Sequence, residues 1–161
     1  MLKINIICVG SLKEAYLRDA AAEYLKRLSR YAKITVTEAK EARLPANASR
    51  ADEEAVKNAE GAAILGKIGV GPQYVIALDV RGESLSSERF ARRIRELSAS
   101  GTSSIAFIIG GSLGLSDDVL QAADFRLSFS PMTFPHQLMR VILLEQIYRA
   151  GKINSGESYH K

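Results

Sequence analysis

Short apolar runs rich in β-branched residues recur along the chain, and stretches with helical periodicity separate them. The runs predict buried strands at residues 2–9, 33–37, 74–80, 105–109 and 125–128. Between them, apolar residues three and four apart predict helices at 17–28, 52–67 and 86–100, a helix after Ser116, and a long helix at 135–149. This alternation favours one α/β domain over residues 1–161, with a mostly parallel sheet flanked by helices.

Polar and breaking residues predict the ends of these elements. Asp52 is expected to cap the helix at 52–67, and Thr133 to cap the long helix that begins near Pro135. Residues 81–83, Arg-Gly-Glu, are expected to form a turn after the third strand. Residues 151–161 lack periodicity and are expected to form an unstructured tail.

The long helix is apolar around most of its circumference, which is unusual for a helix of a small protein. Its apolar residues include Leu138, Val141, Leu143 and Ile147. A helix of this kind must be covered on two sides. We therefore expect a second subunit to cover one side, with Leu143 and Ile147 as candidate contacts, so that the folded unit is a homodimer.

A glycine-rich segment, "GGSLG" at 110–114, directly follows the strand at 105–109. It matches neither the Rossmann glycine pattern nor a phosphate-binding P-loop. A plain tight turn is one interpretation. A nucleotide-like ligand site is the favoured one, because ligands of open α/β sheets bind at the carboxyl ends of strands. The strand ends near Gly110 and Phe129 are expected to face one such site.

Composition narrows the class of protein only moderately. The 22 Lys and Arg residues exceed the 18 Asp and Glu residues by a net charge of +4, which permits a polyanionic partner without requiring one. The single cysteine, Cys8, excludes a disulfide framework within the chain, and no metal site is expected. The sequence shows no signal peptide and no run long enough to cross a membrane, so a cytoplasmic protein without a membrane partner is expected.

Several polar clusters have both a functional and a structural interpretation. His136 and Arg140, four residues apart, form either a polar rim or a pair that faces a substrate, and the two interpretations carry equal weight. The arginines at 89, 92 and 93 favour a solvated face over an RNA phosphate site. Glu145 and Arg149 have the spacing of a structural ion pair. The terminal Tyr159, His160 and Lys161 are either frayed or suited to an RNA base and its phosphate.

Longer motifs resemble the RlmH family of SPOUT-class methyltransferases, which modify a pseudouridine in the RNA of the large ribosomal subunit. The motifs are "ALDVRGESLSSERFA", "FIIGGSLGLSDDVL", "LSFSPMTFPHQLMRVILLEQIYRA" and the end "GESYHK". The similarity extends from "INIICVG" to the last residue, and Ser158 is a minor departure where other members often have proline or alanine.

The resemblance implies a SPOUT fold with a C-terminal trefoil knot, a homodimer, and methyl transfer from S-adenosylmethionine to N3 of a pseudouridine in 23S rRNA of the assembled ribosome. By position it implies a cofactor site made of Leu78, Gly110, Phe129, Ser130, Pro131, Met132, Thr133 and Phe134. The candidate catalytic residues are Arg140, His160, Tyr159 and His136. The alternative hypothesis is a nucleotide- or RNA-binding module without catalysis.

Overall fold

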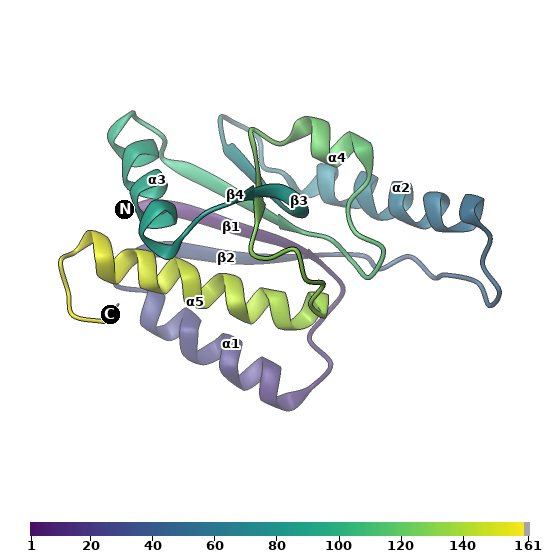
Figure 1. The fold of residues 1–161 in the computed structure, drawn as a ribbon, viewed down its shortest axis with the longest axis horizontal. Coiled ribbons are helices and arrows are strands. Elements are labelled where there is room, and N and C mark those ends of the chain that lie inside the picture. The colour runs from purple at the N-terminus through teal and green to yellow at the C-terminus, as the bar shows by residue number, and fades with distance from the viewer. Residues whose placement is uncertain (160–161) are drawn as a thin grey trace.

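The computed structural model describes residues 1–159, which are built around a 5-stranded sheet in the order β2-β1-β4-β3-β5 (Figure 1). All neighbouring strands pair in parallel. Their bounds are β1 Leu2–Val9, β2 Ala32–Ala39, β3 Tyr74–Ser84, β4 Ser104–Ile109 and β5 Phe125–Ser128. The α/β class and the parallel sheet predicted from the sequence are confirmed.

Helices cover both faces of the sheet. One face carries α1 Ala15–Leu28, α3 Ser87–Ala99 and α5 His136–Asn154, and the other carries α2 Arg50–Lys67 and α4 Asp117–Ala122. Helix α5 packs between α1 and α3 on its face of the sheet (Figure 1). Among residues 1–159, no helix is long and apolar enough to cross a membrane.

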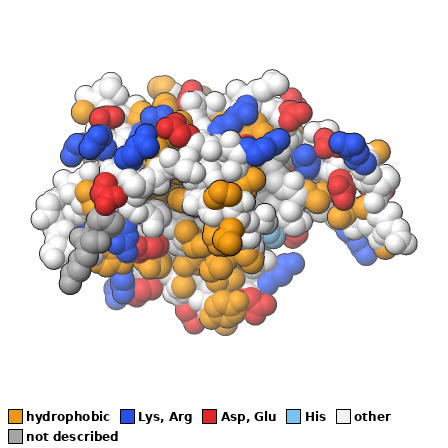
Figure 2. Space-filling model, in the orientation of Figure 1, with side chains coloured by type: hydrophobic (Ala, Val, Ile, Leu, Met, Phe, Trp, Pro, Cys, Tyr) orange, Lys and Arg blue, Asp and Glu red, His pale blue; other side chains and the backbone are white. Residues whose placement is uncertain are grey.

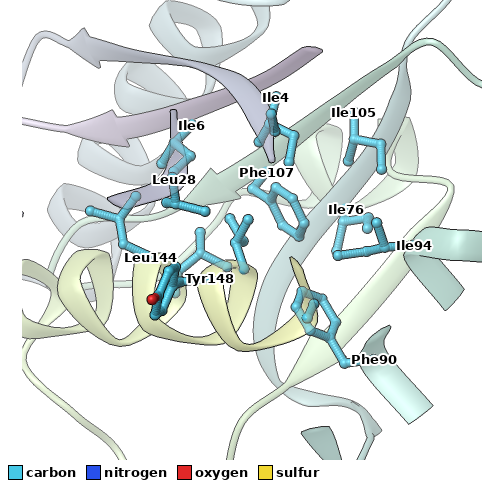
Figure 3. Close-up of a cluster of buried hydrophobic side chains, with 14 of the residues drawn as sticks. Ile4, Ile6, Leu28, Ile76, Phe90, Ile94, Ile105, Phe107, Leu144 and Tyr148 are labelled. Carbon is cyan, nitrogen blue, oxygen red and sulfur yellow. The ribbon is translucent and has the colours of Figure 1, made fainter. Parts of the chain in front are cut away.

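The central strands β1 and β4 are buried on both faces, which is why they are almost continuously apolar. Ile6 and Phe107 face α1, α3 and α5, whereas Ile7 and Ile108 face α2 and α4. Figure 3 shows Phe107 near Phe90 of α3, and their ring centroids are 6.1 Å apart. The larger of the two cores therefore fixes α5 against the middle of the sheet.

Helix α2 begins at Arg50, so the prediction that Asp52 is its cap was wrong. Ser49 is the N-cap, and its hydroxyl accepts the backbone N–H of Asp52 at 3.1 Å. The Asp52 carboxylate accepts the backbone N–H of Ser49 at 2.9 Å in return. Asp52 was predicted at the N-cap but is the third residue after it, where its carboxylate completes a reciprocal capping box.

Helix α5 differs from its prediction at both ends. Pro135 occupies the N-cap position without a side-chain hydrogen bond, so Thr133 is not the cap. The helix continues to Asn154, five residues beyond the predicted end at 149. Leu143 and Ile147 are 0% and 3% exposed within their own chain, so they are core residues and not contacts with a second subunit.

The segment after α5 folds back onto its own chain as far as Tyr159, so the prediction of an unstructured tail was wrong for these residues. The Tyr159 hydroxyl donates to Glu145 at 3.0 Å, and its ring meets that of Tyr148 edge-on at 5.1 Å. Glu157 accepts hydrogen bonds from Tyr31 and Lys152, each at 2.7 Å. His160, a predicted catalytic residue, and Lys161 lie outside the described residues.

Candidate active site

A cavity of about 650 Å³ lies where the carboxyl ends of β3, β4 and β5 meet. Its walls are the end of β3, the glycine-rich loop after β4, and the segment between β5 and α5. This is where an open α/β sheet binds its ligands. The cavity is lined by most of the residues predicted to bind a cofactor, namely Leu78, Gly110, Phe129, Ser130, Met132, Thr133 and Phe134, and Pro131 is not among its lining residues.

The wall from β3 is an irregular strand rather than the predicted turn at 81–83. Leu127 of β5 pairs with both Leu78 and Glu83, so residues 79–82 bulge out of the ladder. The Ser128 hydroxyl fastens the bulge, lying 3.0 Å from the carbonyl oxygen of Val80. Gly82 lies so close to β5 that a Cβ there would be 2.6 Å from the Arg126 carbonyl oxygen. The bulge therefore turns residues 78–81 toward the cavity.

The wall from β4 is a tight turn, as one interpretation of "GGSLG" expected, and it lines the cavity, where the ligand-site interpretation stays a prediction. Gly114 has φ +85° and donates its N–H to the Gly111 carbonyl at 3.1 Å. A Cβ on Gly110 would stand 2.9 Å from the carbonyl carbon of Gly114. Position 110 must be glycine for this turn to close. Because glycine has no side chain, backbone atoms form the surface that a ligand would meet there.

The third wall leads into α5. The Met132 N–H donates to the Ser130 hydroxyl at 3.0 Å, which holds the segment in a turn. His136, the first residue of α5, lines the cavity. Burial lowers the pKa of His136, the carboxylate of Glu41 raises it, and the charges of Arg140 and Lys13 lower it further. The net effect favours the neutral imidazole, which can accept a proton.

Arg140 points away from the cavity, although it follows His136 by one helical turn. Its guanidinium is buried and donates to the Glu38 carboxylate at 2.8 Å and to the Gly10 carbonyl at 2.9 Å. Arg140 therefore ties α5 to the carboxyl ends of β1 and β2. His136 and Arg140 are not brought together as a pair at the cavity.

Tyr159 lies at the other end of α5. Besides Glu145 and Tyr148, it contacts Arg149, whose guanidinium lies 4.7 Å from the centre of its ring. These partners follow His136 by two to four helical turns, which is about 14 Å or more along the axis. Tyr159 is not among the lining residues of its own chain's cavity. Glu145 and Arg149 form the predicted ion pair at 2.7 Å.

Sequence reasoning missed several charged residues at the cavity. Asp79 and Arg81 line it from the β3 bulge, and Lys57 lines it from α2. Position at a strand end was a usable signal for Asp79, whereas nothing in the sequence indicated Lys57. In the basic helix α3, Arg93 stacks on Phe125 with its guanidinium 3.7 Å from the ring centre. Within residues 1–159, no three His, Cys, Asp or Glu side chains come together to hold a metal ion.

Comparison with known proteins gives matches over the whole chain. Residues 2–160 match the family model described as "Predicted SPOUT methyltransferase". The proteins named "Ribosomal RNA large subunit methyltransferase H" from Alkaliphilus oremlandii (strain OhILAs) and Clostridium novyi (strain NT) are each 58% identical to it over 160 residues, covering 99% of this chain and 100% of theirs.

A solved structure shares the fold. It is titled "The structure of a probable methylase family protein from Haemophilus influenzae Rd KW20", and it is 12% identical with a TM-score of 0.55. The match covers 98% of this chain and 70% of that chain. At this identity the likeness concerns the fold alone.

Proposed function

The chain belongs to the SPOUT methyltransferase family, as a relative of the ribosomal RNA large subunit methyltransferases H, and we propose that it transfers the methyl group of S-adenosylmethionine to N3 of a pseudouridine in 23S rRNA. The cavity at the ends of β3, β4 and β5 carries this proposal, because it joins the segments that the family resemblance assigns to the cofactor.

The cavity suits S-adenosylmethionine in size and in chemistry. Its volume of about 650 Å³ lies within the ~300–1,000 Å³ typical of small-molecule sites. Apolar walls come from Leu78, Leu115, Phe129 and Met139. Exposed backbone of the glycine loop and of the segment around Ser130 offers N–H and C=O groups to a base and an amino-acid moiety. Leu78, Gly110 and residues 129–134 would hold the cofactor.

When bound, the cofactor supplies a methyl group that is already activated on a sulfonium sulfur. The protein's residues then have to orient the target base and remove the N3 proton as the N3–C bond forms and the C–S bond breaks toward sulfur. His136 takes up this proton at a ring nitrogen, since its lowered pKa keeps the imidazole neutral. Arg140 acts as a positioning residue, holding the start of α5 against β1 and β2.

The protein works as a homodimer whose interface includes the start of α5. Helix α5 is covered by α1 and α3, yet Leu138 near its start is 37% exposed. Met132 and Phe134, in the segment just before α5, are 71% and 36% exposed. Tyr16, at the start of α1, is 69% exposed. Figure 2 shows hydrophobic side chains gathered on this part of the surface. Such a patch beside a ligand site is typical of a protein interface.

Each active site combines residues of both subunits. Tyr159 is fixed against residues 145–149 of its own chain, far along α5 from the cavity of that chain. Tyr159 and His160 therefore act at the partner's cavity, where an aromatic ring and an imidazole hold the target base. The substrate is the RNA of an assembled ribosome in the cytoplasm, and the mildly basic surface suits it.

A C-terminal trefoil knot belongs to this proposal. Strand β5 pairs with β3 at the edge of the sheet, whereas α5, which follows it, packs between α1 and α3 over the middle of the sheet (Figure 1). Residues 129–135 make this return beside the β3 bulge and the glycine loop, and together these segments line the cavity. Threading of this segment would account for the shared cavity walls.

Two measurements test the proposed function. Isothermal titration calorimetry with S-adenosylmethionine and S-adenosylhomocysteine should show one site per chain for both compounds. Ribosomes from a strain that lacks the endogenous enzyme should accept labelled methyl groups at a pseudouridine. RNA binding that is indifferent to both compounds, without methyl transfer, would instead support the binding module.

A further inference from the structure

A buried carboxylate lies directly behind the glycine loop of the cavity. Glu60 of α2 is 4% exposed, and its Oε2 accepts the backbone N–H of Ala42 at 3.1 Å. Its Oε1 lies 2.8 Å from the position that a Cβ on Gly111 would take. Gly111 itself lines the cavity, so only one glycine residue separates this carboxylate from the space that a ligand would fill.

The charge of Glu60 is not compensated. Within residues 1–159, no Lys or Arg nitrogen forms an ion pair with it, whereas Lys57 and Arg81 at the cavity lie 3.1 and 3.9 Å from Glu54 and Asp79. Burial raises the pKa of Glu60, the Ala42 N–H lowers it, and the carboxylate of Glu41 raises it. A buried charge of this kind costs stability, and such groups concentrate at functional sites.

We propose that Glu60 is a specificity-determining residue that favours the cationic methyl donor over its neutral product. This rests on the proposed function, in which the cavity binds S-adenosylmethionine. The donor carries a sulfonium cation, and loss of the methyl group converts it to an uncharged thioether. Because the glycine at 111 carries no side chain, the negative potential of Glu60 reaches the cavity through weakly polarisable protein.

The consequence is a site that holds substrate more tightly than product. At an effective dielectric constant of about 20, unit charges ~10 Å apart interact by an energy equivalent to roughly tenfold in affinity. Transfer of the methyl group removes this attraction, so the product leaves more readily. Glu60 acts without touching the ligand, as a fixed charge behind the wall.

The test compares the affinities of the two compounds for wild type and for Glu60→Gln by calorimetry at about pH 8, on the alkaline side of neutral because burial raises the pKa of Glu60. The variant should bind S-adenosylmethionine on the order of tenfold more weakly and S-adenosylhomocysteine almost unchanged. Glu53→Gln, an exposed change on the same helix, is the matched control and should leave both affinities at wild-type values.

Equal losses for both compounds in Glu60→Gln would show that Glu60 only holds the loop, and no loss would show that its charge is irrelevant. Either result overturns the inference while wild-type binding still supports the proposed function. A wild type that binds neither compound would overturn both.

Thermal denaturation controls for folding. Since the pKa of Glu60 is raised in the folded state, its contribution to stability is lost as pH rises, and the Gln variant should unfold no earlier than wild type at neutral pH. Glu60→Met is the second neutral variant and should give the same selective loss.

Discussion

Gly82 shows how one residue shapes the cavity wall. It needs no left-handed backbone, yet a Cβ there would lie 2.6 Å from the Arg126 carbonyl oxygen and 2.7 Å from its carbon. Backbone cannot yield as a flexible side chain can. We expect Gly82→Ala to push the β3 bulge off β5, lowering the free energy of unfolding by about 1–3 kcal/mol and weakening cofactor binding.

Urea denaturation and calorimetry measure these two effects. Gly66→Ala is the matched control, because a Cβ at this position in α2 would meet nothing within 4 Å. Alanine is the better helix former by about 0.5–1 kcal/mol, so this control should be stabilised. A Gly82→Ala variant as stable as wild type would show that the bulge can relax away from β5.

Single residues also show where prediction from sequence ends. Gly110 and Phe129 could be placed at one site because the carboxyl ends of parallel strands lie at one edge of the sheet, and the family resemblance added Leu78. The role of Arg140 could not be found in this way. Its partner Glu38 lies 102 positions away in the sequence, and only the packing of α5 against β1 and β2 brings them together.

At the scale of elements, the apolar pattern located every strand and helix of residues 1–159 but not all of their ends. The last turn of α5 contains Gly151 and Asn154, which are poor helix formers. Its helical conformation depends on distant contacts: the Asn154 amide donates to the Ala91 carbonyl at 3.0 Å, and Gly151 packs under Tyr31. Such contacts leave no local pattern, so the sequence predicted a tail.

Two leucines of helix α5 distinguish packing within the chain from contacts in the proposed dimer. Leu138 is 37% exposed, whereas Leu143 is fully buried in its own chain. We expect Leu138→Asp to give a folded monomer, because its charge stays in water once the dimer dissociates. Leu143→Asp should unfold the chain, since it buries a charge without a partner. Sedimentation velocity and circular dichroism measure these outcomes, and a wild-type monomer at micromolar concentration would refute the proposed dimer.

The whole molecule, as proposed, divides each active site between two chains. Within one chain, Tyr159 packs against residues 145–149 of α5, while the cavity lies at the start of that helix. In a two-fold homodimer with antiparallel α5 helices, the end of each α5 would lie beside the start of the partner's, which would allow each tail to serve the partner's cavity. Deleting residues 158–161 should therefore abolish methyl transfer and leave cofactor binding intact.

The last prediction concerns mixed dimers of the tail-deleted chain and a chain with Gly110→Val. A side chain at 110 meets the backbone of Gly114, so this change displaces the glycine turn and blocks the cavity. Neither parent homodimer should be active. A heterodimer keeps one intact cavity facing one intact tail only if the tail works across the interface, and a random mixture should then recover roughly a quarter of wild-type methyl transfer. Labelled transfer to ribosomes measures the activity, and native mass spectrometry measures the heterodimer fraction. Inactive heterodimers would mean that the tail serves its own chain, because cavity and tail would then be intact in different sites.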